Sequence, residues 1–366
     1  MKDIFEELKT LTAIPALSGH EDWMIGQIIE RLKPLADDIE IDRVGNLTAT
    51  FYGRSNEKLS MLVFAHVDEV GMIVRKIEED GFLRFERVGG IPEKTLRGQY
   101  VDVYSIDGTS YVTGVIGTVA HHLTTPEEKT SVPSRLDMYI DIGLTSREEV
   151  LAKGINIGSP ITYHPNFNKI GENRIASKSL DNRIGVYLLL RLAEYLHLNQ
   201  PSVRVSLVFS VQEEFNVRGL LPVFERLKPH AAICLDITPA CDTPDLKMIY
   251  DVALSKGPAI TYMNFHGRGT LGGLLPNPKL RRFIELTAED LKIPYQREVI
   301  VGVITDDAFS QFAGTEGTAI AHLSIPIRYS HSPIEIADIR DIEAGATLLN
   351  EVIRRFNGNL DLQRGI

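Results

Sequence analysis

The chain has 366 residues, and its 39 Lys and Arg against 49 Asp and Glu give a formal net charge of −10. The hydrophobic content of 43% and the charged content of 24% are typical of a globular protein and exclude a disordered or low-complexity chain. The acidic balance argues against binding to nucleic acid or to an anionic membrane, and the length favours two domains of about 150 residues each.

Cysteine content and the N-terminus bear on the compartment. Cys234 and Cys241 are too few for a disulfide framework, which favours a reducing environment. The sequence contains no apolar run of about 18 residues, and its first residues read as an acidic amphipathic helix rather than a signal peptide. We therefore expect a cytoplasmic protein that does not span a membrane.

The first 68 residues alternate between helices and strands. Apolar spacing predicts a helix over residues 1–12 and a second helix shortly after it. Ser18 is the expected N-cap of the second helix, with Glu21 as its capping-box partner. Strands are expected at residues 39–42, 47–52 and 59–65, the last one buried and parallel.

The middle of the chain has a different pattern. From about residue 72 to residue 163, short alternating segments are separated by Gly and Asp turns, with one helix near residues 146–153. Short strands at this spacing predict a small β-barrel or sandwich.

From about residue 167 the α/β pattern returns. Helices are expected at residues 184–198, 220–227, 279–291 and 339–356, and strands at 203–211, 231–236 and 318–323. Residues 357–366 read as a loose polar tail. The alternation predicts an α/β fold with a mostly parallel sheet: a three-layer α/β/α domain formed by residues 1–68 and 168–366, interrupted by a β-rich, barrel-like insert at residues 69–167.

Five short phrases place an Asp, Glu or His at the end of an expected strand or the start of an expected helix, the edge at which α/β sheets bind ligands. The first follows the strand at 59–65 and contains His66 and Asp68. In an extended segment both side chains lie on one side, so His66 can bind a metal through one ring nitrogen while Asp68 fixes the other. A surface histidine beside acidic residues explains this phrase equally well.

The other four phrases are weaker when taken singly. Asp181 before the long helix and Asp236 after a strand are both more typical of helix or strand caps. Glu213 and Glu214 are adjacent carboxylates that repel each other unless a cation neutralises them, although a solvated acidic turn is an alternative. His331 alone is more typical of a structural histidine.

Apart from Asp68, which would orient His66, the phrases together supply two His, two Asp and two Glu. Imidazole and carboxylate ligands suit a pair of divalent ions, with zinc preferred and cobalt or manganese as alternatives. Two ions about 3.5–4 Å apart, an activated water and a carboxylate base are the apparatus of two-metal hydrolases. The combined pattern therefore predicts a metal-dependent hydrolase.

These phrases resemble those of the co-catalytic di-metal aminopeptidases, a family that includes glutamyl aminopeptidase, deblocking aminopeptidase and the tetrahedral aminopeptidases. The similarity spans nearly the whole chain. The matching phrases are Ile14-Pro15-x-x-Ser18-Gly19, Pro126-Glu127-Glu128, Asp141-Ile142-Gly143, residues 179–185, Asp242-Thr243-Pro244, Gly257-Pro258-Ala259 and His331-Ser332-Pro333-x-Glu335.

The resemblance implies a set of metal ligands. His66 and Asp236 would bind one ion, and Glu214 and His331 would bind the other. Asp181 would bridge the two ions. Each chain would therefore hold two divalent ions.

The resemblance also implies the catalytic groups and the assembly. Glu213 would be the general base that deprotonates the bridging water and passes the proton to the leaving amine, and Asp68 would be the partner of His66. The insert would be a dimerisation domain, and the resulting homodimers would be able to build a tetrahedral shell of twelve subunits.

Three phrases depart from the family pattern. Phe215-Asn216 stands where Val-Gly usually follows the glutamate pair, Ala120-His121-His122 stands where Pro-Pro-His is usual, and residues 305–308 read Thr-Asp-Asp-Ala instead of Thr-Asp-Ala. None of these changes removes a ligand. Phe215 and Asn216 adjoin the expected site, so they bear on substrate preference.

We therefore expect a metal-dependent aminopeptidase that hydrolyses N-terminal residues from short peptides. Two alternatives stay open: a di-metal amidohydrolase or deacylase of small metabolites, and a non-catalytic assembly protein that retained the fold. Arg268, Arg328 and Lys256 are the basic candidates for a pocket that accepts an acidic first residue. Residues 267–272 fit a dinucleotide glycine pattern, but no clean helix follows them, so a loop near the substrate entrance is the preferred interpretation.

Overall fold

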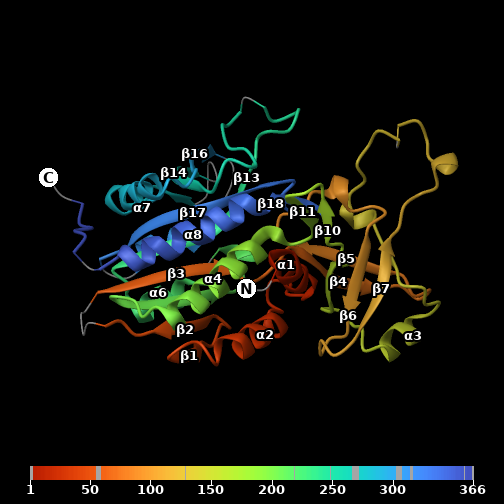
Figure 1. Cartoon of the computed structure of the whole chain (residues 1–366). Helices are drawn as coiled ribbons and strands as arrows, with labels where there is room; N and C mark the ends of the chain where they lie inside the picture. The colour runs from red at the N-terminus through yellow and green to blue at the C-terminus, as the bar shows by residue number, and fades with distance from the viewer. Residues whose placement is uncertain are drawn as a thin grey trace.

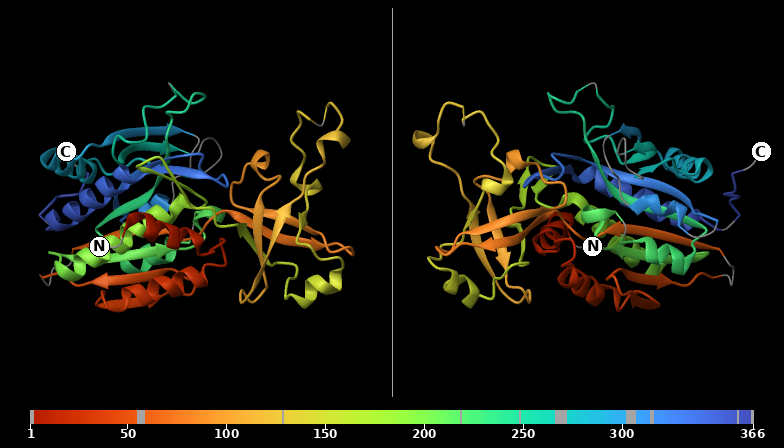
Figure 2. Two further views of the ribbon diagram at one scale, coloured as in Figure 1. Left: turned by 45° about the vertical axis from the view of Figure 1, so that its right-hand side comes forward. Right: turned by 180° about the vertical axis from the view of Figure 1, so that it is seen from behind.

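The structure is a computed structural model of the chain. It describes residues 3–54, 59–127, 129–217, 219–247, 249–265, 272–301, 307–313, 316–357 and 359–364. The chain forms a layered α/β part and, beside it, a smaller β-barrel (Figure 1). Both views of Figure 2 show the barrel at one side of the layered part, with the long loop between β7 and β8 projecting from it.

Within the described residues, twelve strands form one large sheet. Its main path runs in the order β1-β2-β12-β3-β13-β17-β18-β11-β10, and β14 joins β15 and β16 to β17. The central strands β12, β3, β13 and β17 are parallel, whereas the pairs toward the edges are mostly antiparallel. The strands of this sheet are β1 (Asp38–Ile41), β2 (Leu47–Phe51), β3 (Ser60–His66), β10 (Asn168–Ile170), β11 (Arg174–Ser177), β12 (Arg204–Ser210), β13 (Ala231–Pro239), β14 (Ala259–Phe265), β15 (Gly273–Leu274), β16 (Gln296–Val301), β17 (Ala319–Arg328) and β18 (Glu335–Asp338).

Helices cover both faces of the sheet because each face is apolar. One face packs against five helices: α1 (Ile4–Ala13), α2 (Asp22–Leu32), α4 (Leu180–Leu198), α7 (Pro278–Leu291) and α8 (Ile339–Arg355). The other face packs against α6 (Leu221–Leu227), where the rings of Phe224 and Phe64 meet edge to face with centroids 5.7 Å apart. The single turn α5 (Glu213–Asn216) connects β12 to this second layer. This is a three-layer α/β/α arrangement, as the sequence pattern predicts.

The barrel closes in the order β4-β5-β8-β7-β6-β9 and has an apolar core of its own. Closure leaves no free sheet edge within the barrel. Its elements are β4 (Gly71–Ile77), β5 (Leu83–Val88), η1 (Glu93–Thr95), β6 (Tyr100–Tyr104), β7 (Tyr111–Ile116), η2 (His121–Leu123), η3 (Arg135–Asp137), β8 (Ile140–Asp141), α3 (Arg147–Ala152) and β9 (Pro160–Tyr163). The β-barrel alternative to a sandwich is thus the correct one. The domain boundaries at residues 68/69 and 167/168 stay a prediction.

Three local expectations are wrong. The second helix begins at Asp22 with Glu21 at its N-cap, and the Ser18 hydroxyl donates to Asp68 instead of capping the helix. The part of the tail at residues 359–364 is not loose, because Leu360 and Leu362 pack against the main core. The strand expected at 318–323 continues to Arg328, and η4 (Asp307–Phe312) precedes it.

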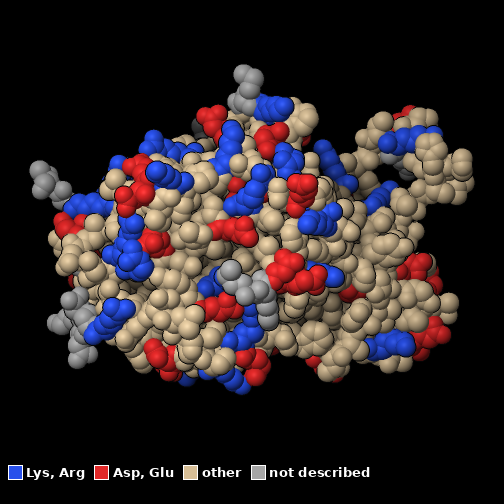
Figure 3. All heavy atoms as spheres, in the orientation of Figure 1, with Lys and Arg blue, Asp and Glu red and all other residues tan. Residues whose placement is uncertain are grey.

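The surface mixes charges of both signs. Figure 3 shows acidic and basic side chains interspersed over the visible face, without a broad area of one sign. Among the described residues, none of the helices combines the length and the apolar character needed to cross a bilayer.

Candidate metal centre

Five segments bring the expected site residues to one edge of the large sheet. His66 is the last residue of β3, Glu213 and Glu214 begin α5 directly after β12, and Asp236 lies in β13. Asp181 lies at the start of α4, and His331 lies in the loop after β17. Because β12, β3 and β13 are parallel neighbours, their carboxyl ends meet at this edge.

Strand alternation places two of these side chains on the same face. Leu62 and Phe64 of β3 pack toward α6, and His66 continues their row. Cys234 of β13 also belongs to that layer, and Asp236 is the next residue on its side. The α6 face of the sheet therefore becomes polar where α6 no longer covers it.

Asp181 lies between the two histidines. Its Oδ1 atom is 3.2 Å from Nε2 of His66, and its Oδ2 atom is 3.3 Å from Nε2 of His331. Nε2 of His66 is also 3.7 Å from Oδ1 of Asp236, and Nε2 of His331 is 3.3 Å from Oε2 of Glu214. One carboxylate thus serves two separate ligand groups.

Glu213 lies beside this cluster. Its Oε2 atom is 3.9 Å from Nε2 of His66, and its side chain is buried. One ligand atom each from His66, Asp181 and Glu214 can be chosen so that all lie within 4.8 Å of one another, a spacing that a single ion can fill.

The protonation preferences reflect crowded carboxylates. Burial disfavours the charged form of His66, but Glu213 and Asp236 outweigh this effect and hold its pKa well above the usual range. The Glu214 carboxylate likewise raises the pKa of His331, while burial raises the pKa of Glu214 itself to about 8. Burial opposes ionisation of Asp181, yet hydrogen bonds with His331 and His66 lower its pKa. Protons therefore supply the positive charge that the cluster needs.

The cluster fits divalent cations. Oε1 of Glu214 is buried, and none of the described residues donates a hydrogen bond to it. The donors at the centre are imidazole nitrogens and carboxylate oxygens, which suit ions of the zinc, cobalt or manganese kind. A bound cation would replace the protons and satisfy the unpaired oxygen.

Three site segments turn through left-handed backbone conformations. Ser179, Gln212 and His331 have φ angles of 58°, 59° and 62°, although none is glycine. Such conformations cost free energy for residues with a Cβ and persist where the surrounding contacts require them. Each of these residues is itself a proposed ligand or lies within two positions of Asp181, Glu213 or Glu214.

The Asp68 carboxylate contacts the turn at Glu213 and Glu214 more closely than it contacts His66. Its carboxylate accepts hydrogen bonds from the Ser18 hydroxyl at 2.5 Å and from the backbone N–H groups of Glu213 and Glu214 at 3.1 and 3.0 Å. Nδ1 of His66 is 3.1 Å from the Asp68 backbone carbonyl but 3.5 Å from its carboxylate. The expected pairing with His66 is therefore made chiefly through the main chain.

Glu335 is a site residue to which the sequence analysis assigned no role. It is buried, and its two carboxylate oxygens accept hydrogen bonds from the N–H groups of Asp181 at 3.0 Å and His331 at 2.8 Å. Burial and the nearby Asp181 charge raise its pKa well above the usual range. Its place in the matched phrase around His331 was the available signal.

A buried ionic group supports the start of α4. Oε2 of Glu69 lies 2.5 Å from Nζ of Lys178, and Oε1 lies 3.4 Å from Nη2 of Arg183. The Arg183 guanidinium also donates to the carbonyls of Leu11 and Ile14 at 3.1 and 3.0 Å. These contacts tie the N-terminal segment to the helix that carries Asp181, and the sequence pattern did not reveal them.

Of the three basic candidates for an acidic-residue pocket, Arg328 is paired with a carboxylate. Arg328 forms a two-point ion pair with Asp242, with N–O distances of 2.7 and 2.8 Å. Lys256 lines a surface hollow together with Asp251. Arg268 lies outside the described residues, as do residues 267–271 of the glycine pattern, Glu128 and residues 305–306.

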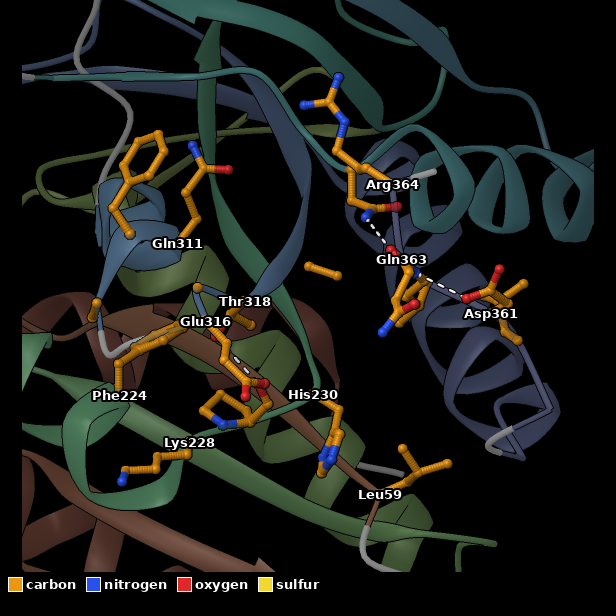
Figure 4. A pocket seen from close by; sticks show the side chains of 18 of the residues that line it. Leu59, Phe224, Lys228, His230, Gln311, Glu316, Thr318, Asp361, Gln363 and Arg364 are labelled. Atoms are coloured by element: carbon orange, nitrogen blue, oxygen red, sulfur yellow. Dashed lines mark hydrogen bonds between the residues drawn. The ribbon is translucent and has the colours of Figure 1, made fainter. Parts of the chain in front are cut away.

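A cavity of about 1270 Å³ lies at the opposite edge of the sheet, near the first residues of β3, β13 and β17. Figure 4 shows Lys228, His230, Glu316 and Arg364 around it, together with apolar side chains and the C-terminal tail. Its charged groups have both signs and are spread along the walls. This lining lacks the convergent ligand set of the carboxyl edge, which we take as the functional site.

Known proteins resemble the chain over most of its length. The profile of the M42 glutamyl aminopeptidase family matches residues 45–348. The predicted aminopeptidase SgcX of Escherichia coli (strain K12) is 42% identical over 92% of this chain and 90% of its own length. The lysyl aminopeptidase of Pyrococcus furiosus is 34% identical over 93% of each chain.

A solved structure gives the same result for the fold. The TET1 peptidase of Pyrococcus horikoshii, described as able to assemble into a tetrahedron or a large octahedral shell, has a TM-score of 0.85 and 30% identity. The alignment covers 97% of this chain and 100% of that chain. The family match over residues 45–348 and the relatives that share the fold place the chain in the M42 glutamyl aminopeptidase family, as a peptide hydrolase.

Proposed function

We propose that the protein is a two-metal aminopeptidase that removes N-terminal residues from short peptides. The observation that carries the proposal is the position of Asp181, whose two carboxylate oxygens lie 3.2 and 3.3 Å from Nε2 of His66 and His331. A carboxylate shared between two imidazole ligands suits a pair of ions better than a single one. His66 with Asp236 and His331 with Glu214 complete the two ligand groups.

The chain's own groups divide the work. When bound, the ions would polarise the scissile carbonyl and lower the pKa of a water molecule. Glu213 would accept the proton of that water and donate it to the leaving amine, since its carboxylate lies beside the cluster without being needed as a ligand. Asp68 would keep Glu213 in place through the backbone N–H at 3.1 Å.

The nature of the ions follows from the donors. Imidazole and carboxylate ligands favour zinc, with cobalt or manganese as alternatives. Cys241, which follows Asp236 by five residues in sequence, is buried and directs its thiol toward the Pro239 carbonyl. We therefore assign the centre to nitrogen and oxygen ligands only.

The subunits would form dimers, and twelve of them would build a closed shell. The shell-forming TET1 peptidase supports this part of the proposal. The insert at residues 69–167 would supply the dimer contact, and the exposed side chains of Leu123 and Leu136 on the projecting loop are suited to it. A cytoplasmic location completes the proposal, supported by two cysteines that are not joined in a disulfide.

Specificity for the first residue is the least constrained part. Arg328 is paired with Asp242, so its positive charge is already neutralised. Arg328 therefore does not favour peptides with an acidic first residue. We therefore assign no charge preference to the pocket from these side chains.

A substrate panel tests the proposal. The metal content of the purified protein would be measured first. The protein would then be assayed on aminoacyl chromophores, short peptides and N-acyl amino acids. Light scattering would give the mass of the assembly. We expect two ions per chain, release of N-terminal residues and a homo-oligomer. Activity on N-acyl substrates alone would support the deacylase alternative, and loss of one or both ions without activity would support an assembly protein.

A further inference from the structure

A turn of the inserted barrel touches the metal centre. Gly89 and Gly90 follow β5, and the Gly90 carbonyl oxygen lies 3.2 Å from Nδ1 of His331. The two residues are 241 positions apart in the chain. The barrel therefore contacts a side chain that the proposed function assigns to the second ion.

This contact determines which ring nitrogen of His331 can bind a metal. A carbonyl oxygen can only accept, so Nδ1 must carry the hydrogen that is donated to Gly90. In the neutral ring, Nε2 then keeps its lone pair. Nε2 is the atom that lies 3.3 Å from both Asp181 and Glu214.

The turn also fits closely against the centre. A Cβ added to Gly90 would lie 3.1 Å from Nδ1 and 3.5 Å from Cε1 of His331. A Cβ added to Gly89 would lie 3.4 Å from the Glu214 carbonyl oxygen and 2.7 Å from a methyl group of Val70. Both residues proposed for the second ion are thus in contact with this turn.

The turn is anchored in the barrel. Ile91 is fully buried in the barrel core, and its N–H donates to the Gly89 carbonyl at 3.1 Å. Gly89 has a φ of 89°, which favours glycine, whereas Gly90 lies outside this left-handed range. The position of the Gly90 carbonyl therefore depends on how the barrel sits against the layered domain.

We propose that the inserted barrel completes the metal centre, with the Gly90 carbonyl as the group that orients His331 for the second ion. Glu335 accepts from the main-chain N–H of His331, whereas the Gly90 carbonyl faces Nδ1 of the ring, so Gly90 supplies the contact on the Nδ1 side of the ring. The first ion's ligands, His66 and Asp236, have no such dependence because both lie in strands of the large sheet. This inference rests on the proposed function.

Gly90→Ala tests the inference, with Gly26→Ala as the matched control. Alanine is compatible with the backbone at Gly90, so the substitution acts through the new contact with His331. A Cβ at Gly26, in α2, would meet nothing within 4 Å. Both variants and the parent would be stripped of metal and titrated with zinc against a chelator, with thermal unfolding of the metal-free proteins as the check on folding.

The expected result is a selective loss. In Gly90→Ala the second zinc should bind about 10–100-fold more weakly, as when the partner of a histidine ligand is lost. The affinity for the first zinc should match that of the parent and of Gly26→Ala, and the metal-free unfolding temperature should not fall below that of the parent. Gly26→Ala itself should unfold slightly above the parent, because alanine is favoured over glycine inside a helix. Equal weakening of both ions, or no weakening, would overturn the inference. A parent protein that binds fewer than two ions would instead contradict the proposed function.

Neutron diffraction from crystals of the parent protein provides a test that needs no variant. A hydrogen on Nδ1 of His331, directed at the Gly90 carbonyl, is the expected result. An Nδ1 that donates to any other group would overturn the inference even if Gly90→Ala failed to fold.

Discussion

The two histidines of the metal centre are held in different ways. His66 ends a central strand, its side chain is 2% exposed, and its Nδ1 faces a carbonyl only two residues away. His331 lies in a loop with a positive φ, and its side chain is 33% exposed. Its Nδ1 faces the Gly90 carbonyl, and its main-chain N–H donates to Glu335. One ligand is thus part of the sheet, whereas the other is assembled from separate segments.

This difference would affect the two ions of the proposed centre unequally. The ligands in β3 and β13 share the stability of the parallel sheet, because unfolding them requires breaking the core. The ligands around His331 depend on the loop after β17, on β18 and on the barrel turn. The second site should therefore be the first to respond to substitutions and to pH.

The largest expected effect concerns Glu213, which is assigned to neither of the two ligand groups around His66 and His331. Glu213→Gln should lower kcat by about 10²–10⁴-fold, the usual contribution of a general base, because an amide cannot accept the proton. Both ions should remain bound, as measured by metal analysis. Glu225→Gln on the exposed side of α6 is the control. Near-normal turnover in Glu213→Gln would mean that Glu213 is not the general base.

Glu335→Gln should sharpen the difference between the two sites. The amide retains only one acceptor oxygen for the N–H groups of Asp181 and His331, and its NH₂ group would face the other donor. We expect a loss of about 10–100-fold in zinc affinity, greater for the ion at His331, in a chelator titration. Glu343→Gln, exposed on α8, provides the comparison. Equal affinities in both variants would show that His331 needs no such support.

The pH dependence of stability should follow from the second site. In the metal-free protein burial raises the pKa of Glu214 from 4.5 to about 8. A carboxyl with a raised pKa stabilises the fold fully below its unfolded pKa and loses this contribution as the pH rises through its folded pKa. His331, whose pKa is also raised by Glu214, changes stability in the same direction.

Zinc should offset this loss of stability at high pH, because Glu214 and His331 must both be deprotonated to bind the metal. We expect the Tm difference between zinc-loaded and chelator-treated protein to widen from about pH 5.5 to about pH 8.5. Thermal unfolding at constant ionic strength measures it. A difference that stays constant or narrows would mean that Glu214 and His331 are not ligands.

The smallest effect is expected at the opposite edge of the sheet. Lys228→Ala removes one of the charged side chains around the cavity in Figure 4, far from both histidines along β3 and β13. Neither kcat/KM nor zinc affinity should change beyond experimental error. A loss of activity in a folded Lys228→Ala variant would mean that this cavity takes part in function.

Elements with strong local patterns were predictable. The strand predicted from the apolar run at β3 and the helix predicted from the amphipathic pattern at α8 are both confirmed. Burial of one or both faces of an element produces a regular spacing of apolar residues in the sequence. Strands β14, β16 and β18 were not recognised. β16 alternates between buried and exposed residues at the side of the sheet, and β18 has only four residues. The formation of a short strand depends on pairing with neighbouring strands, and the local sequence carries little information about that pairing.

The Ser18 cap illustrates the same limit. The capping-box pattern favoured Ser18 as a helix cap, but its hydroxyl is taken by Asp68, 50 residues away. An N-cap hydroxyl would accept a hydrogen bond from a helix N–H, whereas the Ser18 hydroxyl donates to a buried carboxylate in a charge-assisted hydrogen bond. A distant partner therefore overrode a local rule.

The sequence by itself determined the family and the α/β class and predicted the types of candidate ligand, because these depend on residue identity and on local periodicity. Tertiary structure decided which oxygen of Asp181 faces which histidine, that Asp68 holds the Glu213–Glu214 turn, and that Glu335 and Gly90 flank His331. These contacts join segments up to 241 residues apart, and a backbone carbonyl such as that of Gly90 carries no side-chain signal. Only the packing of the barrel against the layered domain brings them together.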